Sequence, residues 1–246
     1  VHLFGQCADM GKLNEIAKKH NLFVIEDAAQ ALSSIYCDEK GLSGKAGTLG
    51  HIGTTSFFPS KNLGCFGDGG AIISHKLDYS ADCETISNHG SEFKYDHIEV
   101  GVNSRLDSIQ AAILRVKLKH LKEYNQSRSE AAARYDELLK DTTGITIPHR
   151  DNRSSHVFHQ YTIIIDPFYT DNVTIQKELE KSNIPTAIYY PKPIHLQNAY
   201  NWLDYREGDF PVSEKLSKTV LSLPMHTELC AEQQEYIAER LIAAIK

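Results

Sequence analysis

Residues 54–74 read Thr-Thr-Ser-Phe-Phe-Pro-Ser-Lys-Asn-Leu-Gly-Cys-Phe-Gly-Asp-Gly-Gly-Ala-Ile-Ile-Ser, and the fold prediction starts from this stretch. Its two ends, Thr54–Phe58 and Ala71–Ser74, are short runs typical of strands. Residues 64–70 between them hold four glycines in seven positions, which favours a tightly turning loop over a helix. This loop is not a Walker A loop, and it does not open a helix as the dinucleotide fingerprint requires. The stretch therefore predicts two strands joined by a loop that begins at Lys61.

A helix and a further strand are predicted before this stretch. Residues 13–17 carry apolar side chains at helical spacing, and the helical pattern ends at His20-Asn21. The apolar run Leu22–Ile25 follows, and its polar boundaries are typical of a buried parallel strand. It leads into Glu26-Asp27, at the edge where open α/β sheets place ligand-binding groups. We therefore predict an α/β fold with a ligand site at this edge.

The chain beyond residue 104 is predicted to be helical over a long distance. One apolar stripe runs from Leu106 to Leu121, a second covers Ala131–Leu139, and Gly144–Pro148 breaks the pattern. The remainder predicts a smaller α/β unit of strand Tyr161–Ile165, helix Val173–Lys181, strands Ala187–Tyr190 and Val220–Leu223, and a final helix Glu232–Ile245. We predict a large domain over residues 1–125, followed by a connecting helix and a small domain over residues 126–246.

Composition excludes several classes of function. The net charge of -6 is spread along the chain, so no basic stripe indicates nucleic acid, and no run approaches the ~18 apolar residues of a membrane helix. The five cysteines are scattered and form no C-x-x-C pair, which disfavours a disulfide framework or a zinc site and favours a reducing cytoplasm. The chain starts at Val1-His2-Leu3-Phe4, inside an apolar run and without Met, so we interpret it as a fragment.

Asp27 and Lys61 are the first candidates for chemistry. A carboxylate at a strand end is costly unless it meets a cation or several donors, although capping of the next turn is the commoner role of such an Asp. A lysine that reaches a desolvated pocket has a lowered pKa and can form an imine with a carbonyl, although a lysine in a loop is more often a surface residue. Ser56, Ser60 and the loop amides could hold a phosphate.

The neighbourhoods of these residues resemble the active-site core of the sugar-nucleotide aminotransferases, the DegT/StrS group of fold-type-I pyridoxal-phosphate enzymes. The likeness covers nearly the whole chain in the right order, through the segments His2–Met10, Glu26–Ala31, Ser56–Gly64, Gly67–Ala71, His89-Gly90, Gly101–Asp107, Tyr190–His195 and Leu221–His226. It implies a large domain with a mostly parallel sheet, incomplete at its N-terminus, and a smaller C-terminal α/β domain.

The resemblance also implies roles for single residues around pyridoxal phosphate. Lys61 would be the Schiff-base lysine and the proton carrier of the reaction. Asp27 would pair with the ring nitrogen, Gln30 with the ring hydroxyl, and Ser56 with the phosphate. Asn103 would reach the phosphate of a neighbouring subunit, so we expect a homodimer with composite active sites.

Four residues would border the substrate. Arg105 is a candidate anchor for a carboxylate, because its planar fork suits that group, although an ion pair at the start of the long helix is an equal alternative. His89, Tyr190 and His195 would lie near the sugar, with a packed or surface role as the alternative for each.

The implied reaction moves an amino group from glutamate to a UDP- or dTDP-linked keto sugar. Residues 94–105 favour slightly the relatives that act on UDP-linked 3-keto sugars, and 4-keto sugars remain the competitor. A related branch replaces the lysine with histidine and dehydrates sugars, so Lys61 favours transamination. Family members also carry an N-terminal region with a further phosphate-binding turn that is not in this chain. The alternatives are a non-catalytic regulatory or scaffold protein that kept the fold, or a generic α/β ligand-binding domain.

Overall fold

The structure is a computed structural model, and it describes residues 1–245. The chain forms two compact units, which are described one at a time. The first comprises Val1–Gln126 with Arg150–His159, and the second comprises Ser127–His149 with the chain from Gln160 onward. The predicted domain division at residue 125 stays a prediction. The two compact units do not follow a single boundary in the sequence, because residues 150–159 belong to the first unit.

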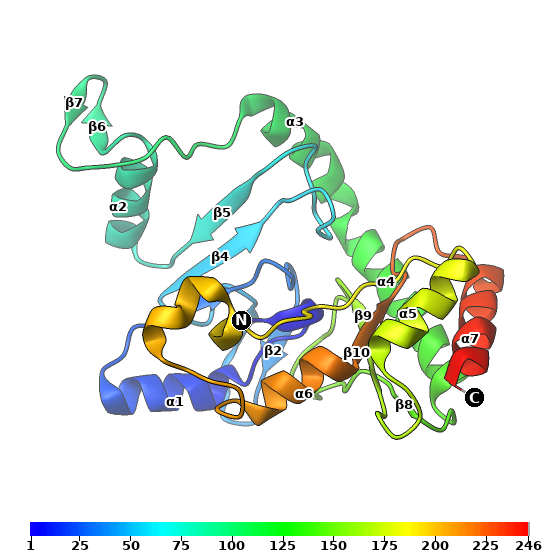
Figure 1. The fold of residues 1–246 in the computed structure, drawn as a ribbon. Helices are drawn as coiled ribbons and strands as arrows, with labels where there is room; N and C mark the ends of the chain where they lie inside the picture. Colours follow the sequence, from blue (N-terminus) through cyan, green and yellow to red (C-terminus); the bar gives the residue numbers. More distant parts are fainter. Residues whose placement is uncertain (246) are drawn as a thin grey trace. The chain divides into compact units, whose positions relative to one another are not determined.

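The first unit holds most of the strands (Figure 1). Its elements in chain order are η1 Leu3–Gly5, α1 Met10–His20, β1 Ile25–Asp27, β2 Ile35–Cys37, β3 Ser43–Lys45, β4 Ile52–Ser56, β5 Gly70–Ile73, α2 Leu77–Ser87, β6 Ser91–Phe93, β7 Asp96–His97, α3 Ser108–Lys117 and η2 Leu118–His120, and α4 Leu121–Leu139 follows. No described helix is long and apolar enough to cross a membrane.

Local signals determine where the helices begin and end. The Asp9 side chain accepts a hydrogen bond from Lys12 N at the start of α1, and Asn21 ends the helix in the left-handed conformation at φ 52°. The side chain of Asp107 caps α3 by accepting from Ile109 N at 2.8 Å. The helix predicted from Ser104 therefore begins four residues later, at Ser108, because the cap decides the first turn.

Strands β1, β4 and β5 form the sheet that carries the candidate site. Strand β1 pairs in parallel with β4, and β4 pairs antiparallel with β5, so the expected parallel character holds for one of the two pairings. The strand predicted at Leu22–Ile25 lies instead at Ile25–Asp27. The expectation that this run is buried is wrong for Leu22, Phe23 and Ile25, which are exposed, because β1 lies at an edge of the described sheet.

The second unit is an antiparallel sheet with helices. It comprises β8 Ile145–Thr146, β9 Tyr161–Ile165, α5 Asn172–Lys181, η3 Ile194–Leu196, η4 Asn198–Leu203, α6 Pro211–Thr219, β10 Val220–Leu223 and α7 Ala231–Ile245, with strand order β10-β9-β8. Strands β9 and β10 match their predicted bounds. The strand predicted at Ala187–Tyr190 is absent: one bridge joins Ala187 to Ser222, and the backbone bends at Tyr189, so the pairing does not continue.

Candidate active site

The carboxyl ends of β1 and β4 bring two predicted site residues to one edge of the sheet. Asp27 is the last residue of β1 and pairs with Thr54 of β4. Ser56, two residues beyond Thr54, ends β4. Because cross-strand partners and residues two apart share a face, Asp27 and Ser56 lie at the same edge and on the same face.

The carboxylate of Asp27 is exposed and has little local support. Its Oδ1 accepts one hydrogen bond, from Ala29 N at 3.0 Å. Within residues 1–245 it pairs with no Lys, Arg or His side chain. A carboxylate in this position is suited to a cationic partner from outside the described chain.

Lys61 lies in the turn that follows β4. Its backbone N–H donates to Phe58 O at 2.9 Å, and its side chain is half-buried. Burial lowers the pKa of the Lys61 amine from its usual value, and the negative charge of Asp27 offsets part of this effect. The two side chains are therefore close enough to interact electrostatically, and the neutral amine that a carbonyl reaction needs is favoured by its surroundings.

Helix α3 holds the glycine-rich loop that begins at Lys61. Gln110 Oε1 accepts from Phe66 N at 2.8 Å, and Lys117 Nζ donates to Gly64 O at 2.5 Å. The Lys117 ammonium also lies 5.7 Å from the centre of the Phe66 ring. Residues 110 and 117 are two helical turns apart and share one face, so a single face of α3 supports the loop.

The residue after Lys61 ties this loop to the segment that follows β1. The buried Asn62 donates through Nδ2 to Asn125 Oδ1 at 2.7 Å and to Val157 O at 2.8 Å. Asn125 in turn donates to Leu32 O at 3.4 Å. This relay of amides connects the backbone beside Lys61 with the segment that carries Gln30.

Gln30 and Ser56 each make a local hydrogen bond. Gln30 Oε1 accepts from Phe4 N at 2.6 Å, and Ser56 Oγ accepts from Phe58 N at 3.2 Å. The Phe4 contact orients the Gln30 amide, because its oxygen faces a backbone donor and its NH2 group must point elsewhere. Both side chains are half-buried, at the same end of the sheet as Asp27.

Three further predicted residues lie around helix α2 in the first unit. Asn103 and Arg105 are exposed and help to line an open groove of about 790 Å³ that also includes Thr54. Asn103 forms an isolated bridge with Asn88. His89 is exposed and has a positive φ of 65°, and its N–H donates to Val102 O at 2.9 Å.

Tyr190 and His195 belong to the second unit. Tyr190 is exposed, and its ring lies 5.5 Å from that of Tyr189. The His195 side chain is only 8% exposed, and its Nε2 lies 3.0 Å from Glu214 Oε1. Glu214 also accepts hydrogen bonds from the backbone N–H groups of Gly208 and Phe210. His195 therefore has a structural partner in its own unit.

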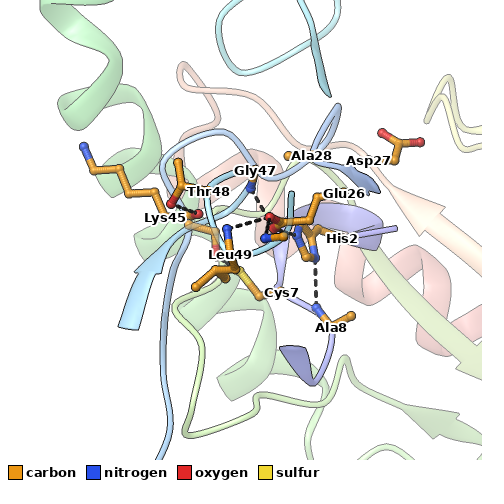
Figure 2. Close-up of polar contacts among 12 residues, drawn as sticks. His2, Cys7, Ala8, Glu26, Asp27, Ala28, Lys45, Gly47, Thr48 and Leu49 are labelled. Carbon is orange, nitrogen blue, oxygen red and sulfur yellow. Dashed lines mark hydrogen bonds and ion pairs between the residues drawn. The ribbon is translucent and has the colours of Figure 1, made fainter. Parts of the chain in front are cut away.

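The structure shows a buried polar cluster that the sequence interpretation missed. Glu26 and His2 are 2% and 1% exposed, and Nε2 of His2 lies 2.7 Å from Glu26 Oε2 (Figure 2). Period-two alternation was the available signal: if Asp27 faces one side of the strand, Glu26 must face the other.

Together these groups can serve a carbonyl cofactor with a cationic ring. They provide a half-buried amine with a lowered pKa, a carboxylate without a cationic partner in the described chain, and a hydroxyl at the adjacent strand end. A lysine amine with a lowered pKa, close to an acid without a cationic side-chain partner among the described residues, fits pyridoxal phosphate, whose ring nitrogen is a cation when protonated.

Two curated relatives match over nearly the whole chain. The Pleiotropic regulatory protein of Geobacillus stearothermophilus is 46% identical over 98% of this chain. The UDP-2-acetamido-2-deoxy-3-oxo-D-glucuronate aminotransferase of Pseudomonas aeruginosa is 41% identical over 93% of this chain. The chain spans 63% and 60% of the length of these two relatives.

Solved structures show the same fold. DesV of S. venezuelae is 36% identical and superposes with a TM-score of 0.91, covering 100% of this chain and 64% of that one. NtdA of Bacillus subtilis, solved with its cofactor pyridoxamine phosphate, is 30% identical with a TM-score of 0.84, covering 99% of this chain and 55% of that one. These matches confirm the predicted fold-type-I α/β fold. A family model matches residues 1–242, and the chain belongs to the DegT/DnrJ/EryC1/StrS aminotransferase family.

Proposed function

We propose that the protein transfers an amino group from glutamate to a nucleotide-linked keto sugar with the help of pyridoxal phosphate. The observation that carries this proposal is the position of Lys61, whose half-buried amine has a lowered pKa and interacts with Asp27 at the carboxyl end of the β1–β4 pair. The bound cofactor in the NtdA structure supports the choice of cofactor.

Four residues of the first unit would hold the cofactor. The Asp27 carboxylate would keep a proton on the ring nitrogen, and the NH2 group of Gln30 would donate to the ring oxygen. The Ser56 hydroxyl, at the end of β4, would donate to the phosphate.

Lys61 Nζ would bind the cofactor and carry the proton. Pyridoxal phosphate, when bound, supplies an aldehyde and a ring that withdraws electrons from the carbon beside an amino group. The Lys61 amine would carry a proton between the substrate carbon that bears the nitrogen and the carbon that the cofactor contributes, in opposite directions for the amino donor and the keto sugar. Its lowered pKa keeps more of the amine neutral at pH 7, which this task requires.

We further propose that the active unit is a homodimer. The hairpin β6–β7 lies beside α2 and away from the sheet that contains β4 and β5 (Figure 1). Apolar side chains in and after the hairpin are exposed, Val100 by 97%: Phe93, Tyr95, Ile98, Val100 and Val102. An exposed apolar patch of this kind is typical of a protein interface. Asn103 directly follows this patch, which supports its assignment to the phosphate of a neighbouring subunit.

We propose that Arg105, His89, Tyr190 and His195 border the substrate. Arg105 lines the open groove beside Asn103, where a carboxylate or diphosphate could reach its guanidinium. His89 and Tyr190 are exposed and accessible to a sugar. His195 has the least support, because its side chain is mostly buried and paired with Glu214.

The names of the relatives favour a nucleotide-linked sugar. The Pseudomonas aeruginosa relative acts, by its name, on a UDP-linked 3-oxo sugar acid, and DesV is structurally similar. We propose a slight preference for UDP-linked 3-keto sugars, with dTDP-linked sugars as competitors, and a place in polysaccharide biosynthesis. The described cysteines are free, which agrees with the reducing cytoplasm that we propose for the enzyme.

A regulatory protein is the second candidate. It is favoured by the name of the Geobacillus stearothermophilus relative, which is 46% identical. The amine of Lys61, with its lowered pKa, and the unpaired Asp27 argue for chemistry instead, because a purely regulatory role would not need this combination.

One experiment separates these candidates. The full-length protein is incubated with glutamate and a panel of UDP- and dTDP-linked 3-keto and 4-keto sugars, and aminated sugar is measured. We expect a visible absorption band that borohydride or glutamate removes, and turnover of at least one UDP-linked 3-keto sugar. A colourless protein without turnover on the whole panel would favour the regulatory role.

A further inference from the structure

The short segment His2–Phe4 contacts the segment Glu26–Gln30 at three points. His2 N donates to Asp27 O at 2.9 Å, and Phe4 N donates to Gln30 Oε1 at 2.6 Å. The third contact joins His2 Nε2 and Glu26 Oε2 at 2.7 Å. The two segments are more than twenty positions apart in sequence, so this brace is a feature of the tertiary structure.

Glu26 is anchored by four donors. Its Oε2 accepts from His2 and from Gly47 N at 2.9 Å, and its Oε1 accepts from Leu49 N at 2.6 Å and from Gly50 N (Figure 2). A carboxylate has about four acceptor positions, and all are used here. Burial alone would raise the pKa of Glu26, but these hydrogen bonds lower it, so the side chain is held as a carboxylate.

The hydrogen bonds also determine the tautomer of His2. Its Nδ1 lies 3.0 Å from Ala8 N, which is a backbone donor, so Nδ1 must be the acceptor. The ring proton then lies on Nε2 and is donated to Glu26. His2 is thus a neutral bridge between the start of the chain and the end of β1.

This anchor determines where Asp27 points. Strand β1 has three residues and, within residues 1–245, pairs with β4 alone, so a short ladder on one side is all that fixes its rotation. Figure 2 shows the Asp27 carboxylate pointing away from the cluster around Glu26. Because neighbouring strand residues face opposite sides, fixing the Glu26 side chain in its donors directs Asp27 to the other face.

We propose that His2–Phe4 is a positioning element for the cofactor ring, and that His2 aims Asp27 through Glu26 while Phe4 N–H orients the Gln30 amide. This inference rests on the proposed function, because the orientation of Asp27 and Gln30 affects cofactor binding only if these two residues hold the ring.

The test compares two cofactors on the full-length protein. Pyridoxal phosphate and its 1-deaza analogue, in which C–H replaces the ring nitrogen, share the aldehyde and phosphate but differ at the atom that Asp27 would contact. The dissociation constant of the 1-deaza analogue, divided by that of pyridoxal phosphate, is measured by absorbance titration. This ratio is high when Asp27 is aligned with the ring nitrogen, so it reports the alignment of Asp27. A general loss of stability weakens both and leaves the ratio unchanged.

The variants separate the two ring nitrogens of His2. His2→Asn keeps an acceptor for Ala8 N and loses the donor to Glu26, and His2→Gln places an amide donor near the former Nε2. Tyr36→Phe is the matched control, since it removes a hydroxyl of the same unit whose partners, Gly11 N at 3.1 Å and Asp9 at 3.1 Å, do not belong to residues 26–30.

We expect His2→Asn to lower the ratio by about tenfold, as misalignment of one charge-assisted hydrogen bond would. His2→Gln and Tyr36→Phe should stay within about twofold of wild type. An unchanged ratio in His2→Asn would overturn the inference. If that variant does not fold, His2→Gln decides: a retained ratio supports the inference, and a ratio that falls by more than about twofold, although the donor to Glu26 is kept, would overturn it. A wild-type ratio near one would instead contradict the proposed role of Asp27.

Discussion

Glu26 and Asp27 are neighbours in β1, yet their carboxylates have opposite surroundings. Glu26 is 2% exposed and accepts hydrogen bonds from His2 and three backbone N–H groups, and Asp27 is exposed and accepts one. Glu26 therefore anchors the strand, and the Asp27 carboxylate faces away from the donors that hold its neighbour.

Replacement of Lys61 tests the proposed chemistry. Lys61→Ala should fold and should lower turnover by at least ~10²–10⁴-fold, because the general base and the imine-forming amine are both lost. Lys61→Arg should not restore activity, since a guanidinium stays protonated. Aminated sugar is measured with glutamate as donor, and Lys45→Ala, an exposed lysine of the same unit, is the control. Near wild-type turnover in Lys61→Ala would contradict the proposal that Lys61 forms the imine and acts as the general base.

Glu26→Gln should change stability and its dependence on pH. The amide must turn its NH2 group toward backbone N–H groups, so we expect a loss of about 3 kcal/mol in the free energy of unfolding at pH 7. The pKa of Glu26 is lowered in the folded protein, so its contribution is present above the usual value of 4.5 and is lost as pH falls through the folded pKa. The free energy of unfolding, measured with denaturant from pH 7 to 3, should therefore fall less with falling pH in the variant than in wild type. Glu137→Gln, at an exposed ion pair, should behave like wild type, and a steep acid loss in Glu26→Gln would contradict the assignment.

His156 should make the protein sensitive to mild acid. Burial, with help from Arg150, lowers the pKa of His156 to about 3 from its usual 6.5, and its ring stacks on Phe158 at 3.7 Å. Between these pH values the unfolded chain binds a proton that the folded chain does not, so stability falls as pH falls from 6.5 toward 3.

His156→Asn isolates this effect, since its side-chain oxygen can still accept from Phe158 N. We expect about 1 kcal/mol lower stability at pH 7, from the lost stacking, and a smaller decline between pH 6.5 and 4. Thermal unfolding across this range gives the measurement, with His20→Asn at an exposed site as the control. Equal slopes in wild type and His156→Asn would refute the prediction.

The exposed segment after β6 should form a subunit interface. Val100→Asp places a charge in the apolar patch, so we expect the full-length protein to shift from dimer to monomer in sedimentation and to lose cofactor affinity. Asn103→Ala should lower cofactor affinity by about tenfold without changing assembly, because it would remove the hydrogen bond to a charged phosphate that we propose for Asn103. Lys122→Ala, an exposed residue of α4, is the control. Monomeric, fully active wild-type protein would end this proposal.

Much of the local structure follows from local sequence. Helix α1 lies between its Asp9 cap and the left-handed Asn21, and strands β9 and β10 occupy their predicted residues. Their signals lie within the segments themselves. The strand predicted at Leu22–Ile25 lies instead at Ile25–Asp27. The residues that pair are determined by β4, which lies more than twenty positions further along the chain, so the apolar run by itself could not set these bounds.

The sequence by itself determined the fold class, the family, and the candidates Asp27 and Lys61, because these depend on residue types at short, fixed spacings. Only the tertiary structure decided which of two adjacent acids is buried, since the donors to Glu26 come from residue 2 and from residues 47–50. It also decided that residues 150–159 return to the first unit and that α3 supports the loop after Lys61. A local pattern specifies which face of a strand a side chain takes, but the groups that cover that face are supplied by folding.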